Sequence, residues 1–182
     1  MPGELDKYAL WARSSNWLAD DSSTREKITE PQRVIVTDRG SLTQALKSID
    51  QQSFQVKVLS EKIDRPHQHE QLKLARDLAR EALIREVELC VYGTAVVFAR
   101  SIIPLSLSAN SSATDSGGLA GLGTTPLGQV LFTDGNIRVS KRDYLFFEHD
   151  EWPLIARRTP YEYYGKTILV SEFFLPALQH YI

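Results

Sequence analysis

The sequence predicts an α+β fold in which most strands run antiparallel. Two apolar segments, residues 83–91 and 95–103, alternate like strands and are separated only by Tyr92-Gly93-Thr94, a spacing typical of a β-hairpin. Helix-like and strand-like segments occur in separate runs, as they do in α+β domains. The 182 residues are enough for one hydrophobic core and contain no convincing domain boundary, so we expect a single domain over residues 1–182.

Each element is expected from its own local pattern. Apolar residues recur at helical spacing near the N-terminus, and Ser23 with Glu26 has the capping-box spacing of a helix start. Alternation of apolar and polar residues predicts the strands. In order, the sequence predicts a helix over 4–19, a short helix from Ser23, a strand over 33–38, a weak helix over 41–50, a strand over 54–59, a helix over 70–80, the hairpin, a helix over 126–132, extended segments over 136–147 and 154–163, and a final strand over 167–175.

The bulk composition argues against several classes of partner. A net charge of −2 and a pI near 6.1 do not suit a nucleic-acid or anionic-membrane surface. The single cysteine, Cys90, cannot form an internal disulfide and fits a reducing compartment. No apolar run approaches the ~18–20 residues of a membrane helix, and the N-terminus lacks the pattern of a secretion signal. We therefore expect a cytoplasmic protein without a membrane span or a nucleic-acid partner.

Two charged residues lie in strands whose neighbours on the same face are apolar. Arg85 shares its parity with Val87, Leu89 and Val91, and Glu172 shares its parity with Ile168, Val170 and Phe174. An unpaired buried ion is costly, so such residues are paired, neutralised or used. One interpretation is a buried site for a small charged ligand, with Arg85 holding a carboxylate and Glu172 a hydroxyl. The alternative is a structural ion pair, either with each other or with other residues.

A second anion-binding feature is predicted where the helix over 126–132 begins. Thr125 is placed as the N-cap and Pro126 as the first helical residue, which leaves the backbone N–H of Leu127 without a partner inside the helix. Such a group favours an anion, although an ordinary capped helix has the same sequence pattern. Arg100, with the parity of Val96 and Phe98, is a second candidate inward arginine, unless it reaches solvent at the end of the hairpin.

Other polar features predict little chemistry. His67 and His69 have a metal-like spacing but lie in a polar loop without further ligands, so we expect no metal site and no cofactor. Residues 149–151 are expected to form a solvated turn. Arg157 and Arg158 are interpreted as a solvated strand edge, with an anion at a pocket rim as the alternative. Residues 106–123, rich in Ser and Gly, are expected to be mobile and to serve as a lid.

Three segments occur in an order that resembles the chorismate pyruvate-lyase family: REVELCVYGTAVVFARSIIP (85–104), LGTTPLGQVLF (122–132) and ARRTPYEYYGKTILVSEFFLPA (156–177). The resemblance implies a single antiparallel sheet with helices packed on one side. It also implies conversion of chorismate to 4-hydroxybenzoate and pyruvate for quinone head groups, without a cofactor and by a monomer. An effector-binding domain of a transcription regulator with a similar fold is the alternative, but no basic recognition helix is visible.

The resemblance also implies positions for the ligand. The resemblance implies that Arg85 and the backbone N–H of Leu127 bind the ring carboxylate and that Glu172 contacts the ring hydroxyl. A further backbone contact is implied near Ser23, and Arg100 matches a family arginine at the end of the hairpin. We expect Arg100 to receive the enolpyruvyl carboxylate. The residues selected by parity and capping are thus also those that the resemblance selects. We expect Arg85 and Glu172 at opposite ends of one pocket, separated by the ligand ring rather than bonded to each other.

Overall fold

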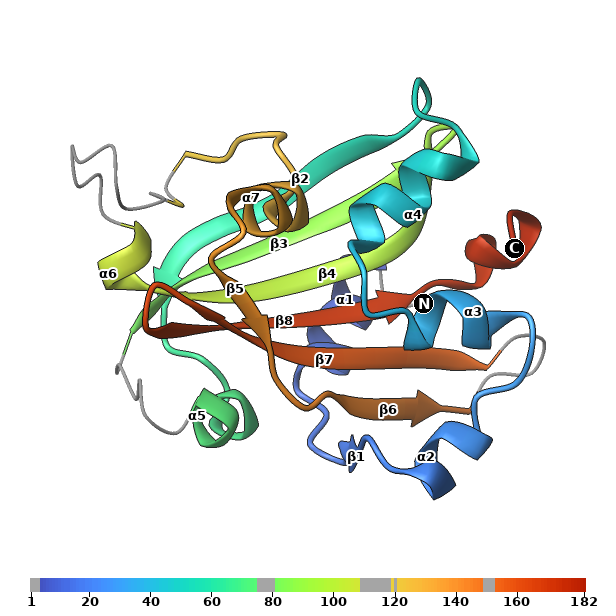
Figure 1. Ribbon diagram of the computed structural model, residues 1–182, viewed down its shortest axis with the longest axis horizontal. Coiled ribbons are helices and arrows are strands. Elements are labelled where there is room, and N and C mark those ends of the chain that lie inside the picture. Colours follow the sequence, from blue (N-terminus) through green and yellow to red (C-terminus); the bar gives the residue numbers. More distant parts are fainter. Residues whose placement is uncertain (1–3, 75–80, 109–118, 120, 149–152) are drawn as a thin grey trace.

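A computed structural model describes residues 4–74, 81–108, 119, 121–148 and 153–182. Eight antiparallel strands form one sheet (Figure 1). Across the sheet the order is β1 (Leu18–Ala19), β6 (Asp143–Phe147), β7 (Leu154–Tyr163), β8 (Lys166–Phe174), β4 (Thr94–Pro104), β3 (Ala82–Val91) and β2 (Gln55–Asp64), with β5 (Ile137–Val139) paired to β7. The single antiparallel sheet expected from the sequence is confirmed.

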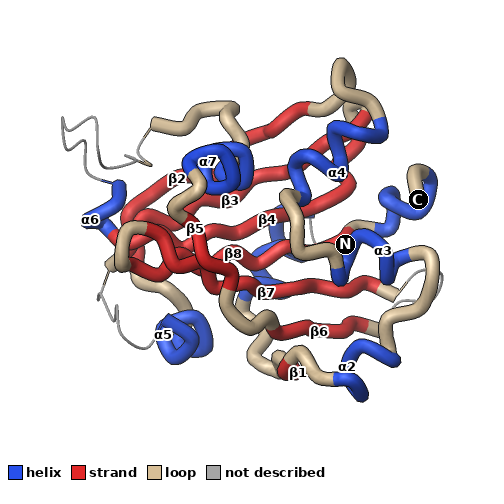
Figure 2. The backbone as a smooth tube through the Cα atoms, in the orientation of Figure 1, coloured by secondary structure: helices blue, strands red, loops and turns tan. Residues whose placement is uncertain are grey.

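The helices lie on both faces of this sheet (Figure 2). They are α1 (Glu4–Ala12), α2 (Ser22–Glu26), α3 (Gln32–Thr37), α4 (Leu42–Ile49), α5 (Gln68–Leu74), α6 (Leu105–Ser108), α7 (Leu127–Asp134) and the 3₁₀ helix η1 (Pro176–His180). Helices α3, α4 and α7 cover one face, which we call the front face. On the back face, Tyr8 of α1 stacks on Phe98 at 4.3 Å and Glu70 of α5 pairs with Arg100. The expected packing of helices on one side of the sheet therefore holds for α3, α4 and α7, whereas α1 and α5 pack on the other side.

The core is layered on either side of the sheet. The front layer joins residues of α3 and α4 to apolar residues of β3, β4 and β8, and a second front cluster forms under α7. The back layer is rich in aromatic side chains, including Phe98, Phe173 and the partly buried Trp11. Apolar residues on both faces explain why strands β3, β4, β7 and β8 are buried along almost their whole length.

The hairpin predicted between residues 83 and 103 is confirmed. Strands β3 and β4 pair in antiparallel register, and Tyr92 and Gly93 connect them with φ values of 50° and 75°. Two left-handed residues in succession are typical of a type I′ turn, whose twist matches that of the flanking strands. The strand expected over 54–59 and the helix expected over 41–50 are also confirmed, as β2 and α4.

The strand predicted over 33–38 is wrong, because this segment forms helix α3. Its buried residues, Gln32, Ile35 and Val36, follow helical spacing, whereas Val34 is 73% exposed. A strand would have placed Val34 and Val36 on the same face. Helix α1 ends at Ala12 rather than at residue 19, since β1 begins at Leu18. The short helix near Ser23 is confirmed, but its N-cap is Asp21. None of the described helices is long and apolar enough to span a membrane.

Candidate active site

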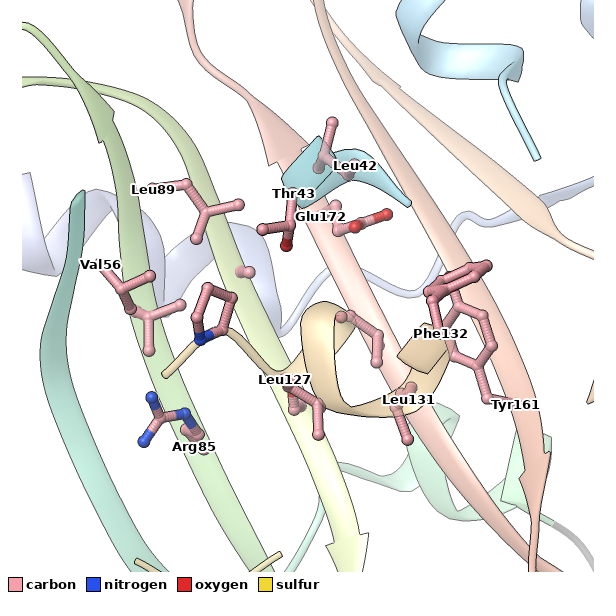
Figure 3. Close-up of a pocket in the computed structure, with 16 residues that line it drawn as sticks. Leu42, Thr43, Val56, Arg85, Leu89, Leu127, Leu131, Phe132, Tyr161 and Glu172 are labelled. Carbon is pink, nitrogen blue, oxygen red and sulfur yellow. The ribbon is translucent and has the colours of Figure 1, made fainter. Parts of the chain in front are cut away.

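A buried cavity lies between the front face of the sheet and the first turns of α4 and α7 (Figure 3). Its volume is about 50 Å³, several times the ~10–15 Å³ that one water molecule needs. Strands β3, β4 and β8 form its floor, and most of its walls are apolar, including Val56, Val87, Leu89, Leu131, Phe132 and Val170. Both charged residues selected by parity, Arg85 and Glu172, line it, so the predicted inward orientation of both is confirmed.

Arg85 forms the positive end of the cavity. Its side chain is 2% exposed, and its Nη1 donates to Glu61 Oε2 of β2 at 2.5 Å. Its Nη2 donates to the carbonyl oxygen of Gly123 at 2.5 Å, with that of Thr125 at 3.4 Å, both in the loop that precedes α7. Register explains the pairing, since Glu61 lies directly opposite Arg85. The sequence did not predict Glu61 as the partner, because a β-bulge between Val58 and Ser60 shifts the alternation of β2.

Glu172 forms the negative end of the cavity. It is 7% exposed, and its Oε2 accepts a hydrogen bond from Arg157 Nε at 2.5 Å. Arg157 lies opposite Glu172 on β7 and is 1% exposed. Burial raises the pKa of the adjacent Tyr161, and the Glu172 carboxylate raises it further. Tyr161 is therefore a hydroxyl donor rather than a base, and Glu172 is the carboxylate among the described residues that line the cavity.

Arg85 and Glu172 face the cavity from different sides, and each is paired with a different residue (Figure 3). Both interpretations left open by the sequence therefore apply in part: each charge has a structural partner, and both border the same cavity. Only Oε2 of Glu172 is used by Arg157, and within the described chain Oε1 has no hydrogen-bond partner. One end can thus receive an anion and the other can accept a hydrogen bond from a hydroxyl group.

Two helix N-termini border the cavity. Leu127 and Gly128 begin α7, but Pro126 is the N-cap rather than Thr125, because Pro126 has extended backbone angles. Leu42 and Thr43 begin α4 and also line the cavity. The two helices touch here, since a Cβ at Gly128 would lie 3.1 Å from Thr43 Oγ1. First-turn N–H groups without partners inside a helix favour an anion.

Sequence reasoning missed the contribution of α4 to the site. The N-cap of α4 is Ser41, whose Oγ accepts from the backbone N–H of Gln44 at 3.3 Å. The pattern Ser41-Leu42-Thr43-Gln44 has the same capping-box spacing that was used for Ser23, so a local signal was present. Nothing in that pattern indicates that this helix start, rather than the earlier one, lies beside Leu127.

The structure places Ser23 outside the cavity. It lies on the exposed helix α2 beside the edge strand β1, and its hydroxyl donates to Asp21 Oδ1 at 2.9 Å (Figure 1). The backbone contact expected near Ser23 is therefore not available to a ligand in this cavity. The start of α4 at Leu42, by contrast, lines the cavity together with the start of α7.

The structure also places Arg100 away from the cavity. Arg100 lies opposite Glu86 and Ser171, whereas its neighbours Ala99 and Ser101 line the cavity, so its side chain projects to the back face. There its guanidinium donates to Glu70 at 2.8 and 3.1 Å and to Glu86 at 2.7 Å. Arg100 is inward, as its parity predicts, but the sheet separates it from Arg85.

The interpretation of Arg157 and Arg158 as a solvated strand edge is wrong. Strand β7 is internal, between β6 and β8, and the two arginines are 1% and 6% exposed. Arg157 projects to the front face, toward Glu172. Arg158 projects to the back face, where it donates to Asp143 at 2.6 Å. The expected turn over 149–151, and most of the Ser/Gly segment over 106–123, lie outside the described residues.

In a comparison with protein families, residues 17–181 of the chain match the chorismate lyase family. The chain belongs to the chorismate lyase family. A probable chorismate pyruvate-lyase of Methylococcus capsulatus is 34% identical over 155 residues, covering 79% of this chain and 93% of that protein. A relative with the same description from Pseudomonas putida is 36% identical over 163 residues, covering 85% of this chain and 86% of that protein.

Among solved structures, the effector domain of PhnF from Mycobacterium smegmatis has a similar fold. The TM-score is 0.50 at 13% sequence identity, and the match covers 76% of this chain and 90% of that one. At this identity the likeness describes the fold only. This chain and that effector domain therefore share an architecture, and the function of this chain has to be argued from its cavity.

Proposed function

We propose that this member of the family is a chorismate pyruvate-lyase, which converts chorismate to 4-hydroxybenzoate and pyruvate. The observation that carries the proposal is the arrangement of Arg85 and Glu172 around one apolar cavity. A para-hydroxylated ring acid has a carboxylate at one end and a hydroxyl at the other. The cavity offers a guanidinium and two helix N-termini to the first group, and a carboxylate oxygen to the second.

The reaction removes the C4 proton of chorismate and breaks the bond between C3 and the ether oxygen. The electron pair of the C4–H bond completes the aromatic ring, and the ether oxygen leaves with the enolpyruvyl group, which becomes pyruvate after protonation. Aromatisation supplies much of the driving force, so positioning is the main contribution asked of the protein. Arg85 and the Leu127 N–H hold the ring carboxylate. Glu172 Oε1 accepts the hydrogen bond of the C4 hydroxyl and, as the carboxylate of the site, receives the C4 proton in this proposal.

Several finer features belong to the same proposal. The protein acts as a cytoplasmic monomer, needs no cofactor, and supplies a head-group precursor for a quinone such as plastoquinone or ubiquinone. A regulator-type effector-binding role is the second candidate, because the fold of this chain is shared with an effector domain. The two differ in one measurable property: an effector-binding domain binds an aromatic acid without turning chorismate over.

The direct test is to incubate the purified protein with chorismate and to follow 4-hydroxybenzoate and pyruvate separately. We expect equal amounts of both products. Folded protein that forms neither product contradicts the lyase assignment, and tight binding of 4-hydroxybenzoate in that case supports the effector-binding role.

The site assignment is tested with Arg85→Ala and Arg85→Lys. We expect kcat/KM to fall at least about 100-fold in both, because lysine lacks the planar fork that matches a carboxylate. Ser23→Ala is the matched control and should retain wild-type kinetics, since Ser23 lies on the exposed helix α2. Near-normal kinetics in Arg85→Lys contradict the role of the guanidinium fork.

A further inference from the structure

An open groove adjoins the buried cavity. Its volume is about 470 Å³, and it is lined by residues of the end of α4, the start of β2 and the loop before α7. Val56 and Pro126 border both the groove and the cavity, so the two spaces adjoin at these side chains. We call this groove, which borders the cavity on the side of α4, the mouth of the cavity.

Lys47 is the charged residue of this mouth. Within the described part of the chain, the other residues lining the groove are Gln51, Phe54, Gln55, Val56, Thr124 and Pro126, none of which carries a charge. Lys47 lies four residues after Thr43 on α4, and Thr43 lines the cavity. Residues four apart share one face of a helix, so Lys47 extends the cavity-facing side of α4 by one turn.

The Lys47 side chain is half-buried and held in place. Its Nζ donates to Gln129 Oε1 of α7 at 2.9 Å, and the same atom lies 5.6 Å from the centre of the Phe54 ring. An ammonium group has three donors, so the bond to Gln129 leaves two for another acceptor. The contact bridges the two helices whose first turns border the cavity.

The substrate of the proposed reaction has two acid groups, whereas Arg85 is the one cation among the described residues that line the cavity. Chorismate carries a ring carboxylate and an enolpyruvyl carboxylate. Arg85 accounts for the first, while Arg157 is paired with Glu172 and Arg100 lies on the back face of the sheet. The enolpyruvyl group is attached to C3, next to C4, so it projects to one side of the line that joins Arg85 and Glu172. The mouth provides room for it.

We infer that Lys47 binds the second carboxylate of the substrate at the mouth of the cavity, an inference that rests on the proposed function. Lys47 then discriminates a dianionic substrate from its monoanionic product. The carboxylate held by Lys47 departs with pyruvate, so pyruvate is released toward solvent through the groove. The 4-hydroxybenzoate left in the cavity makes no contact with Lys47.

The experiment compares Lys47→Gln with the wild-type protein in two measurements. The first is kcat/KM for chorismate, and the second is the equilibrium affinity for 4-hydroxybenzoate. We expect kcat/KM to fall about tenfold, equivalent to ~1.4 kcal/mol, with a weaker dependence on salt, while 4-hydroxybenzoate affinity stays within about twofold. Lys47→Arg should restore most of kcat/KM, because it keeps the charge.

Two control variants separate the charge of Lys47 from other effects. Lys27→Gln makes the same change of net charge at the end of exposed α2 and should leave both measurements unchanged. Gln129→Leu breaks the bridge between α4 and α7 but keeps the Lys47 charge, and it should retain most of kcat/KM. If Gln129→Leu loses as much as Lys47→Gln, Lys47 acts by joining the helices, and the inference is wrong.

The remaining outcomes are also decisive. Unchanged kcat/KM in Lys47→Gln, or an equal loss of kcat/KM and product affinity, overturns the role of Lys47. A wild-type protein without turnover contradicts the proposed function instead. In that case the equilibrium affinities for chorismate and 4-hydroxybenzoate still test Lys47, because the inference predicts that only chorismate binding weakens in Lys47→Gln.

Discussion

The Nε atom of Arg157 donates to Glu172 Oε2 at 2.5 Å, while Nη1 of the same guanidinium donates to three backbone carbonyls at the end of α3. These carbonyls belong to Ile35, Val36 and Asp38 and lie 2.9–3.1 Å away. A guanidinium beside the C-terminal end of a helix completes carbonyl groups that have no partner within the helix. Arg157 thereby fixes helix α3 and the carboxylate of the candidate site with one side chain.

Removal of Arg157 is expected to destabilise the protein strongly. Arg157→Gln leaves Glu172 as a buried carboxylate without its cation, and we expect the free energy of unfolding in urea to fall by about 3–5 kcal/mol. Arg138→Gln is the control. Arg138 lies 3.9 Å from Glu162 and is 81% exposed, so its loss should change stability by less than about 0.5 kcal/mol. Equal stability of Arg157→Gln and Arg138→Gln contradicts a stabilising role for the buried pair.

The pairing of Arg85 with Glu61 predicts that Glu61 opposes ligand binding. A ligand carboxylate at Arg85 lies near the Glu61 carboxylate, which is 2.5 Å from the same guanidinium. We expect Glu61→Gln to increase the affinity for 4-hydroxybenzoate several-fold, because a like charge beside the ligand is removed and the amide still accepts from Arg85. Titration calorimetry measures the change. Weaker binding in this variant shows that the Glu61 charge is needed to orient Arg85.

The close approach of α4 and α7 predicts an effect of a single methyl group. In Gly128→Ala, the new Cβ meets Thr43 Oγ1 at 3.1 Å, so the two helix starts must separate by a few tenths of an ångström. We expect 4-hydroxybenzoate affinity to fall about tenfold, while thermal stability changes little because alanine favours a helix over glycine. Adding Thr43→Ala should recover the affinity. If the double variant does not recover the affinity for 4-hydroxybenzoate, the effect of Gly128→Ala does not arise at the contact with Thr43.

The surroundings of His69 predict a dependence of stability on pH. Burial lowers the pKa of His69, and in this geometry its Nδ1 accepts from Arg158 Nη1 at 3.1 Å while Nε2 donates to the Ala12 carbonyl at 2.9 Å. The neutral ring is thus the form that the fold binds. Below a pH of about 6.5 the unfolded chain takes up a proton that the folded chain resists, so stability falls as pH decreases from 7 to 5.

Denaturation of His69→Gln across that pH range tests this expectation. Glutamine can retain both hydrogen bonds without titrating, so the loss of stability between pH 7 and pH 5 should be smaller than in the wild-type protein. Some loss of stability between pH 7 and pH 5 should remain in His69→Gln, since burial also lowers the pKa of His67. His180→Gln removes an exposed histidine of η1 and is the control for the loss of an imidazole as such. Identical pH dependence in His69→Gln and the wild-type protein contradicts the linkage.

Local patterns were sufficient for most elements of the fold and for two ends of the candidate site. The hairpin was predictable because Tyr92-Gly93 is short and can adopt the turn that its flanking strands require. Arg85 and Glu172 were predictable because strand alternation depends only on the neighbours of each residue. The helix over 33–38 was not predictable from local pattern, because its β-branched residues favour a strand. Burial of Ile35 and Val36 against the sheet selects the helix instead.

The sequence by itself determined that Arg85, Arg100 and Glu172 would face inward, since parity within one strand follows from backbone geometry. Only the tertiary structure decided which side of the sheet each would occupy and which partner it would have. Register between strands placed Arg157 beside Glu172 and Glu61 beside Arg85, and it put Arg100 on the far face. The meeting of the starts of α4 and α7 likewise depends on contacts between segments about 85 residues apart, which no local pattern contains.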